Sequence, residues 1–131
     1  MRVGTSSKPH SKPKILFVGK NFPLDISIVG RLKNAGFDLI SASKATDAIA
    51  KLFANRRVQA VVLDQRRTDN ISLGLARFVK SFRAAVPVIL LSTQLLDPLP
   101  RCIDAGVCVQ DELGGLVPTI QMFLDNPDGS F

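Results

Sequence analysis

Polar side chains that could do chemistry stand directly after three short apolar runs of this sequence. If these runs are parallel strands, their carboxyl ends meet at one edge of a sheet, and the side chains come together there. A carboxylate at that edge can take part in chemistry, or it can only accept hydrogen bonds from loop amides, and both interpretations stay open. These residues are Lys20 and Asn21, which follow Gly19 after the first run, Asp64 after another, and Ser92 and Thr93 at the end of a third.

Two arginine pairs add positive charge near these runs. Arg66 and Arg67 follow Asp64 on a polar loop, where they either contact an anion or an acidic partner or are simply solvated. Arg56 and Arg57 are predicted to complement the carboxyl end of a helix. Together with Lys20, the first pair makes an anion or small-ligand sensor one hypothesis for this edge.

Composition indicates one globular domain. The chain has 131 residues, of which 46% are hydrophobic, and no apolar run approaches the roughly 20 residues of a membrane-spanning helix. The first residues lack the apolar core of a signal peptide, so we expect a cytoplasmic protein without a membrane partner. Cys102 and Cys108 have no companions for a disulfide framework or a zinc site and are expected to be reduced.

The charge is unevenly distributed along the chain. Residues 1–83 hold 16 of the 17 basic and 5 of the 11 acidic residues, a balance of +11, and the remainder has a balance of −5. The molecule is therefore a charge dipole and not a uniformly basic particle. Since Tyr and Trp are also absent, the sequence argues against specific nucleic-acid binding.

Five short apolar runs alternate with segments of helical spacing, which is typical of a parallel sheet covered on both faces. We expect a flavodoxin-like, doubly wound, five-stranded α/β fold with strand order 2-1-3-4-5. Residues 1–13 are predicted to be a flexible basic arm, 14–126 the domain and 127–131 a tail. The predicted strands are Ile15 to Val18, Asp38 to Ala42, Ala60 to Leu63, Val86 to Leu91 and Val107 to Val109.

Helix signals separate the strands. The first predicted helix begins near Pro23 and stops at Gly36, and the second is capped by Ser43 and carries Phe53 on its apolar face. A third contains Leu73, Ala76, Phe78 and Val79, a short one is expected near Arg101 to Asp104, and the last runs from Gly114 to Leu124.

The order of these elements resembles a receiver domain of bacterial two-component response regulators. The resemblance covers about residues 14–125 and depends on VVLD at Val61 to Asp64, PVILLST at Pro87 to Thr93 and the Asp-Ala-Gly step at Asp104. It implies that Asp64 occupies the position of the phosphoryl-accepting aspartate. It also implies a divalent metal held by an acidic pair after strand 1, a hydroxyl residue ending strand 4 and a lysine after strand 5.

Several of those implied residues are missing. The acidic pair aligns with Gly19 and Lys20, and lysine is absent from every position after Lys80. The resemblance also implies an aromatic switch residue on strand 5. It would fall near Cys108 or Val109, where the sequence has no Tyr or Phe, so that only Asp64 and Ser92 match. We therefore expect no cofactor and no metal, and an ion pair between Lys20 and Asp64; Mg²⁺ enters only if Asp64 is a phosphoacceptor.

The sequence thus predicts a standalone, non-enzymatic pseudo-receiver that acts through protein–protein interaction. A phosphoacceptor with an atypical, metal-poor site is the alternative, beside the anion sensor. The expected partner is a regulatory protein or a histidine kinase, or a second copy in a homodimer. The expected interaction face combines acidic and apolar residues near the last strand and helix: Asp104, Asp111, Glu112, Leu113 and Leu116.

Overall fold

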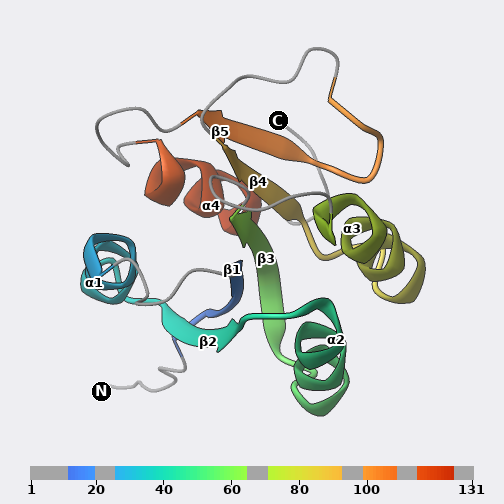
Figure 1. The fold of residues 1–131 in the computed structure, drawn as a ribbon. Coiled ribbons are helices and arrows are strands. Elements are labelled where there is room, and N and C mark those ends of the chain that lie inside the picture. The colour runs from blue at the N-terminus through green and yellow to red at the C-terminus, as the bar shows by residue number, and fades with distance from the viewer. Residues whose placement is uncertain (1–11, 20–25, 65–70, 93–98, 109–114, 126–131) are drawn as a thin grey trace.

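A computed structural model describes residues 12–19, 26–64, 71–92, 99–108 and 115–125 of the chain. They form five strands and four helices in alternation, apart from the direct succession of the last two strands (Figure 1). The strands are β1 (Lys14–Gly19), β2 (Asp38–Ala42), β3 (Val58–Asp64), β4 (Val88–Ser92) and β5 (Ala105–Cys108). The helices are α1 (Ile26–Asn34), α2 (Ala45–Ala54), α3 (Ile71–Phe82) and α4 (Leu116–Asp125).

All neighbouring strands pair in parallel, in the order β2-β1-β3-β4-β5. This confirms the predicted doubly wound sheet. The three central strands β1, β3 and β4 are almost entirely buried, because each contains an apolar run of at least four residues that can face helices on both sides. Short β5 forms one edge of the sheet, and β2 forms the other.

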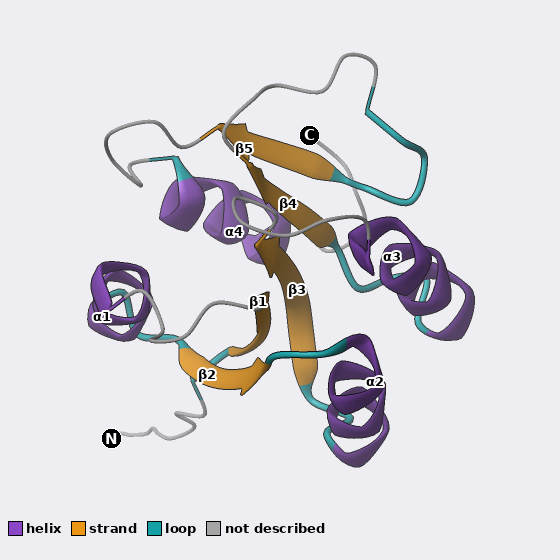
Figure 2. Cartoon of the chain, viewed as in Figure 1, coloured by secondary structure: helices purple, strands orange, loops and turns teal. Residues whose placement is uncertain are grey.

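Helices cover both faces of the sheet: α2 and α3 lie on one side and α1 and α4 on the other (Figures 1 and 2). Successive strand side chains alternate between these layers because a strand has a two-residue period. The face toward α2 and α3 buries Leu16, Val18, Val61, Leu63, Val88 and Leu90. The face toward α1 and α4 buries Ile15, Phe17, Ala60, Val62, Ile89 and Leu91.

The predicted stop of the first helix at Gly36 is confirmed. Gly36 has a φ of 93°, a left-handed conformation that glycine adopts without a steric penalty. Its N–H donates to the Lys33 carbonyl, and the Phe37 N–H donates to the Leu32 carbonyl, at 3.0 and 3.1 Å. Phe37 and Leu32 are both buried in the same cluster, so the helix end is closed by a Schellman motif with its hydrophobic contact.

Two local predictions were wrong. The residue that precedes α2 is Lys44, and no side chain caps the helix, so Ser43 is not its cap. Residues 101–104 form a turn and bends instead of the predicted short helix. Within that turn the Ile103 N–H donates to the Pro100 carbonyl at 3.0 Å, and Cys102 and Ile103 are buried against the α2 and α3 side. Tertiary packing of these two side chains therefore holds the connection without a helix.

Arg83, directly after α3, ties this helix to the loop between α2 and β3. Its guanidinium donates to the carbonyl oxygens of Asn55 at 3.1 Å, Arg56 at 2.5 Å and Val58 at 2.9 Å. Arg56 and Arg57 lie in this loop, beyond the helix end that they were expected to complement. The planar guanidinium suits this task because it can donate to several carbonyls from one position.

An ion pair joins the beginnings of β1 and β2. The Lys14 ammonium lies 2.6 Å from an Asp38 carboxylate oxygen. This hydrogen bond holds the pKa of Asp38 below its ordinary value of 3.8. Desolvation opposes it, and the positive charges of Lys14, Lys12 and Lys33 add weaker attraction. No described helix is long and apolar enough to cross a membrane.

Asp38→Asn should lower the free energy of unfolding by less than about 1 kcal/mol at pH 7, because solvent screens this half-exposed pair. The lowered folded-state pKa means that the stabilisation is complete above about pH 5 and is lost as the pH falls below 3.8. Urea denaturation of both proteins at pH 7 and pH 3 checks this. A difference between the two proteins that persists unchanged at pH 3 would contradict an ionic origin.

Candidate functional site

The carboxyl ends of the central strands bring three of the predicted site residues together. Gly19, Asp64 and Ser92 are the last residues of β1, β3 and β4. Gly19 is the register partner of Asp64, and Asp64 pairs with Leu91, the neighbour of Ser92. Adjacent parallel strands lie about 4.8 Å apart, so these residues share one small region at the edge of the sheet.

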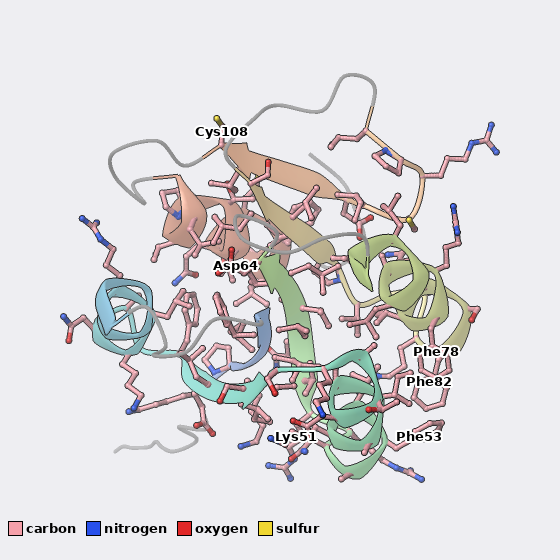
Figure 3. The ribbon with its side chains drawn as sticks, in the orientation of Figure 1. Lys51, Phe53, Asp64, Phe78, Phe82 and Cys108 are labelled. Carbon is pink, nitrogen blue, oxygen red and sulfur yellow. The ribbon has the colours of Figure 1, made fainter. Side chains whose placement is uncertain are left out.

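Asp64 is the only buried charged residue among those described, with 5% of its surface exposed. It lies at the end of the central strand β3 (Figure 3). A carboxylate taken out of water needs hydrogen bonds or an opposite charge to remain favourable, and Asp64 does take part in a polar or electrostatic interaction. Its burial makes any change of charge in its immediate surroundings consequential.

Other predicted members of the site lie outside the described residues. These are Lys20 and Asn21 after β1, Arg66 and Arg67 after β3, and Thr93 after β4. The ion pair between Lys20 and Asp64 therefore stays a prediction.

Cys108 belongs to the edge strand β5. It ends β5, is the register partner of Ser92 and is only partly buried (Figure 3). The predicted strand, Val107 to Val109, was set too late, because β5 already begins at Ala105. Had the Asp-Ala-Gly step been taken as the beginning of the strand, Cys108 would have been placed at its carboxyl end.

The described residues do not fit a magnesium site. Magnesium prefers oxygen ligands in near-octahedral geometry, usually with one or two carboxylates. At this edge of the sheet Asp64 supplies a carboxylate, but Gly19 beside it on β1 has no side chain to offer one. Across the described ranges, no group of three or more His, Cys, Asp or Glu side chains could hold a metal ion.

Asp104, expected on an interaction face, makes hydrogen bonds within the fold. It lies where β4 and β5 begin, at the end of the strands opposite to Asp64. One of its carboxylate oxygens accepts from the Val88 N–H at 2.7 Å and from the Lys80 ammonium at 2.9 Å. Lys80 also donates to the Val86 carbonyl at 3.1 Å. Asp104 thus fixes the start of β4 against the end of α3, and its charge is already neutralised by Lys80.

Leu116 does not lie on the surface. It is 1% exposed, and its side chain packs in the core with Val107 and Ile120. Helix α4 must bury its apolar side against the sheet, and this takes Leu116 away from any partner. Asp111, Glu112 and Leu113 lie outside the described residues, so their part of the predicted interaction face stays a prediction.

Asp104→Ala should lower the free energy of unfolding by about 1 to 2 kcal/mol, because it leaves the buried Val88 N–H without its side-chain acceptor. Asp104→Asn keeps an acceptor oxygen and should cost less. Thermal and urea denaturation of the two variants measure both effects. Equal stability of Asp104→Ala and the unchanged protein would contradict a stabilising role of the Asp104 carboxylate in the fold.

Solved structures share this architecture. A response regulator receiver domain protein from Clostridium thermocellum matches with a TM-score of 0.76 over 88% of this chain and 96% of its own, at 16% identity. The response regulator TrrA from Thermotoga maritima, solved with magnesium and beryllium fluoride, matches with a TM-score of 0.73 over 83% and 96%, at 19% identity. No protein-family model matches the sequence, nor does any curated protein.

The chain has the receiver-domain fold. The likeness spans nearly all of each solved receiver, so the match is to a whole domain and not to a shared βα unit. Within this receiver fold, Asp64 ends the third strand of the sheet and Ser92 the fourth, as the sequence resemblance predicted. The acidic pair expected after β1 is replaced by Gly19 and Lys20.

Proposed function

We propose that this chain is a signalling domain of the two-component type that works through protein–protein contacts and without phosphorylation of Asp64. The observation that carries the proposal is the pairing of Asp64 with Gly19 across β3 and β1. Asp64 supplies the central carboxylate, and Gly19 beside it on β1 offers no oxygen ligand, so the described end of β1 lacks the carboxylate that the resemblance implies for phosphoryl transfer.

Phosphoryl transfer to a carboxylate depends on positive charge that neutralises the equatorial oxygens of the phosphoryl group. A metal ion normally supplies much of this charge, and the donor set around Asp64 does not fit one. No lysine follows Lys80, which excludes a lysine after β5 in any alignment. Lys20 offers one ammonium group, and a single ammonium cannot bridge carboxylate and phosphoryl oxygens as a metal ion does.

A receiver fold that does not switch by phosphorylation still has surfaces with which it can bind other proteins. TrrA has been solved in complex with the histidine kinase ThkA, and that TrrA structure matches this chain with a TM-score of 0.73 at 19% identity. This supports a kinase or another regulatory protein as the partner, and a second copy of the chain is the other candidate. We propose a non-enzymatic role in the cytoplasm.

The second candidate function is phosphoacceptance with an altered site. Its support is the placement of Asp64, buried at the carboxyl end of β3 one strand away from Ser92. Asp64 ends β3 and Ser92 ends β4, the strand ends at which the sequence resemblance implies an aspartate and a hydroxyl residue. This candidate requires Lys20, Arg66 or Arg67 to provide the positive charge that a metal ion would otherwise supply.

An amide NMR titration separates the two candidates. Labelled protein is titrated with Mg²⁺ and then with beryllofluoride, which mimics a phosphoryl group on an aspartate. We expect no change at the amides of Gly19, Asp64 and Ser92. Shifts centred on those amides, absent from Asp64→Asn, would overturn the proposal. Intact mass after incubation with a small phosphodonor provides the covalent counterpart, since phosphoacceptance adds one phosphoryl group that Asp64→Asn lacks.

A further inference from the structure

We propose that the outer face of α2 and α3 is a docking surface for an acidic helix of another protein that carries apolar side chains along one side. The surface is centred on three phenylalanines, called here the aromatic patch: Phe53 on α2 and Phe78 and Phe82 on α3 (Figure 3). The proposal extends the proposed protein-binding function and does not depend on the state of Asp64.

The three rings form one cluster across the two helices. The ring centroids of Phe53 and Phe82 are 4.4 Å apart, those of Phe78 and Phe82 are 5.7 Å apart, and those of Phe53 and Phe78 are 6.1 Å apart. The two longer separations lie in the range of favourable aromatic contacts, about 4.5 to 7 Å, and the shortest lies at its lower limit. The rings therefore hold one another in place and present a preformed apolar surface.

Two of the rings remain largely in solvent. Phe53 is 55% exposed and Phe82 is 42% exposed, although the sequence placed Phe53 on the buried side of its helix. The inner sides of the helices are already filled by other residues, chiefly Ala48 and Leu52 on α2 and Leu75, Ala76 and Val79 on α3. Single exposed apolar residues are common, but a contiguous group of large ones marks an interaction surface.

The charges around the patch indicate what binds it. Arg56 and Arg57 follow Phe53 by three and four residues, and Arg77 immediately precedes Phe78. All three are exposed, and no ion pair involves them in the described part of the chain. Asp47 is the only acidic residue of α2 and α3, and Lys51 lies 3.4 Å from it. Exposed arginines close in sequence to apolar rings give the patch a positive charge that is complementary to an acidic, amphipathic helix.

Single-stranded nucleic acid is the other class of ligand that arginine and aromatic rings can bind. Base stacking needs ring faces that are open to the bases. Here the Phe78 and Phe82 rings are nearly parallel, at 23°, and stack on each other, while Phe53 packs against both. The rings thus form a continuous apolar surface and not separate platforms, which favours aliphatic side chains of a peptide.

The test is fluorescence anisotropy with a labelled helical peptide built only of Glu and Leu, the leucines at i, i+3, i+4 and i+7 spacing. Its comparison probes are the same peptide with Lys in place of Glu and a labelled single strand of thymidines. We expect the Glu–Leu peptide to bind and the other two to bind at least about tenfold more weakly. Asp64→Asn should bind the Glu–Leu peptide as tightly as the unchanged protein does. The peptide result is therefore independent of whether Asp64 responds to beryllofluoride.

Matched variants assign the binding to the patch. Phe53→Ser combined with Phe82→Ser should weaken it at least about tenfold, whereas Met122→Ser, which removes an apolar side chain 43% exposed on α4, should not. Arg77→Glu should weaken it similarly, with Arg31→Glu on α1 as its control. Arg77 is exposed and makes no described ion pair, so this variant tests the proposal even if the double phenylalanine variant does not fold.

Three results would overturn the proposal: no binding of the Glu–Leu peptide at about 1 mM, unchanged binding by the folded patch variants, or tighter binding of the thymidine strand. Sedimentation velocity of the unchanged protein and of Arg77→Glu adds a fourth. Self-association that Arg77→Glu abolishes would identify a second copy as the occupant of the patch in place of an acidic helix from another protein.

Discussion

Arg83→Ala is expected to lower the free energy of unfolding by about 2 to 3 kcal/mol, the largest loss that we predict for a side chain outside the core. The substitution removes three hydrogen bonds from a charged donor to the carbonyls of Asn55, Arg56 and Val58. Two of these bonds are partly buried, so the carbonyls lose partners that water replaces only incompletely. Urea denaturation at pH 7 measures the loss.

Two comparison variants show whether the guanidinium geometry is the cause. Arg83→Lys keeps the positive charge but cannot reach three separated carbonyls at once, so it should recover less than half of the loss. Arg77→Ala removes an exposed arginine from α3, the helix that precedes Arg83, and should leave stability within about 0.5 kcal/mol of the unchanged protein. Full recovery by Arg83→Lys would show that charge alone, and not the threefold contact, stabilises the loop.

The strands could be predicted because a buried strand has a recognisable, apolar composition. A strand covered on both faces must be apolar at every position, and the runs that become β1, β3 and β4 meet that requirement. The second strand was predicted with its observed bounds, Asp38–Ala42. The end of α1 was equally clear, since Gly36 can adopt a left-handed conformation that other residues avoid.

The contacts that could not be predicted join residues far apart in the sequence. Arg83 reaches a loop 25 to 28 residues away, and Asp104 and Lys80 are 24 residues apart. Such contacts depend on how the layers pack and leave no periodic signal in the sequence. The sequence therefore gave no sign that Asp104 bonds to Lys80 and to the Val88 N–H. For the same reason, the sequence could not show that Phe53 meets Phe82 on the outside of the helices.

The candidate site likewise has a part that could be predicted from the sequence and a part that could not. The rule that parallel strands end at one edge was enough to bring Gly19, Asp64 and Ser92 together. The extent of Asp64 burial was not available from that rule, because it depends on the packing of the neighbouring strands and loops. Burial matters here since it strengthens every electrostatic interaction of the carboxylate, whether with a lysine or with a metal ion.

Restoring an acidic pair after β1 should create a magnesium site. In the double variant Gly19→Asp with Lys20→Asp, we expect the affinity for Mg²⁺ to rise by at least about 100-fold, or about 2.7 kcal/mol. The substitutions change the local charge by −3 and place a carboxylate on the register partner of Asp64. Unit charges about 4 Å apart interact by about 4 kcal/mol in a partly buried environment, so the expected gain is conservative.

Thermal denaturation in increasing Mg²⁺ measures this gain, because a ligand that binds the folded state raises its stability by about 1.4 kcal/mol at ten times the dissociation constant. Adding Asp64→Asn to the double variant should remove most of the response, since the third carboxylate is then lost. Lys20→Ala alone removes the opposing charge without adding a ligand and should bind only weakly. If the unchanged protein responded to Mg²⁺ as strongly as the double variant, Gly19 and Lys20 would not be what separates this chain from a metal-dependent receiver. A Mg²⁺ response seen only in the double variant would show that the residues at positions 19 and 20 account for the difference between this chain and a metal-dependent receiver.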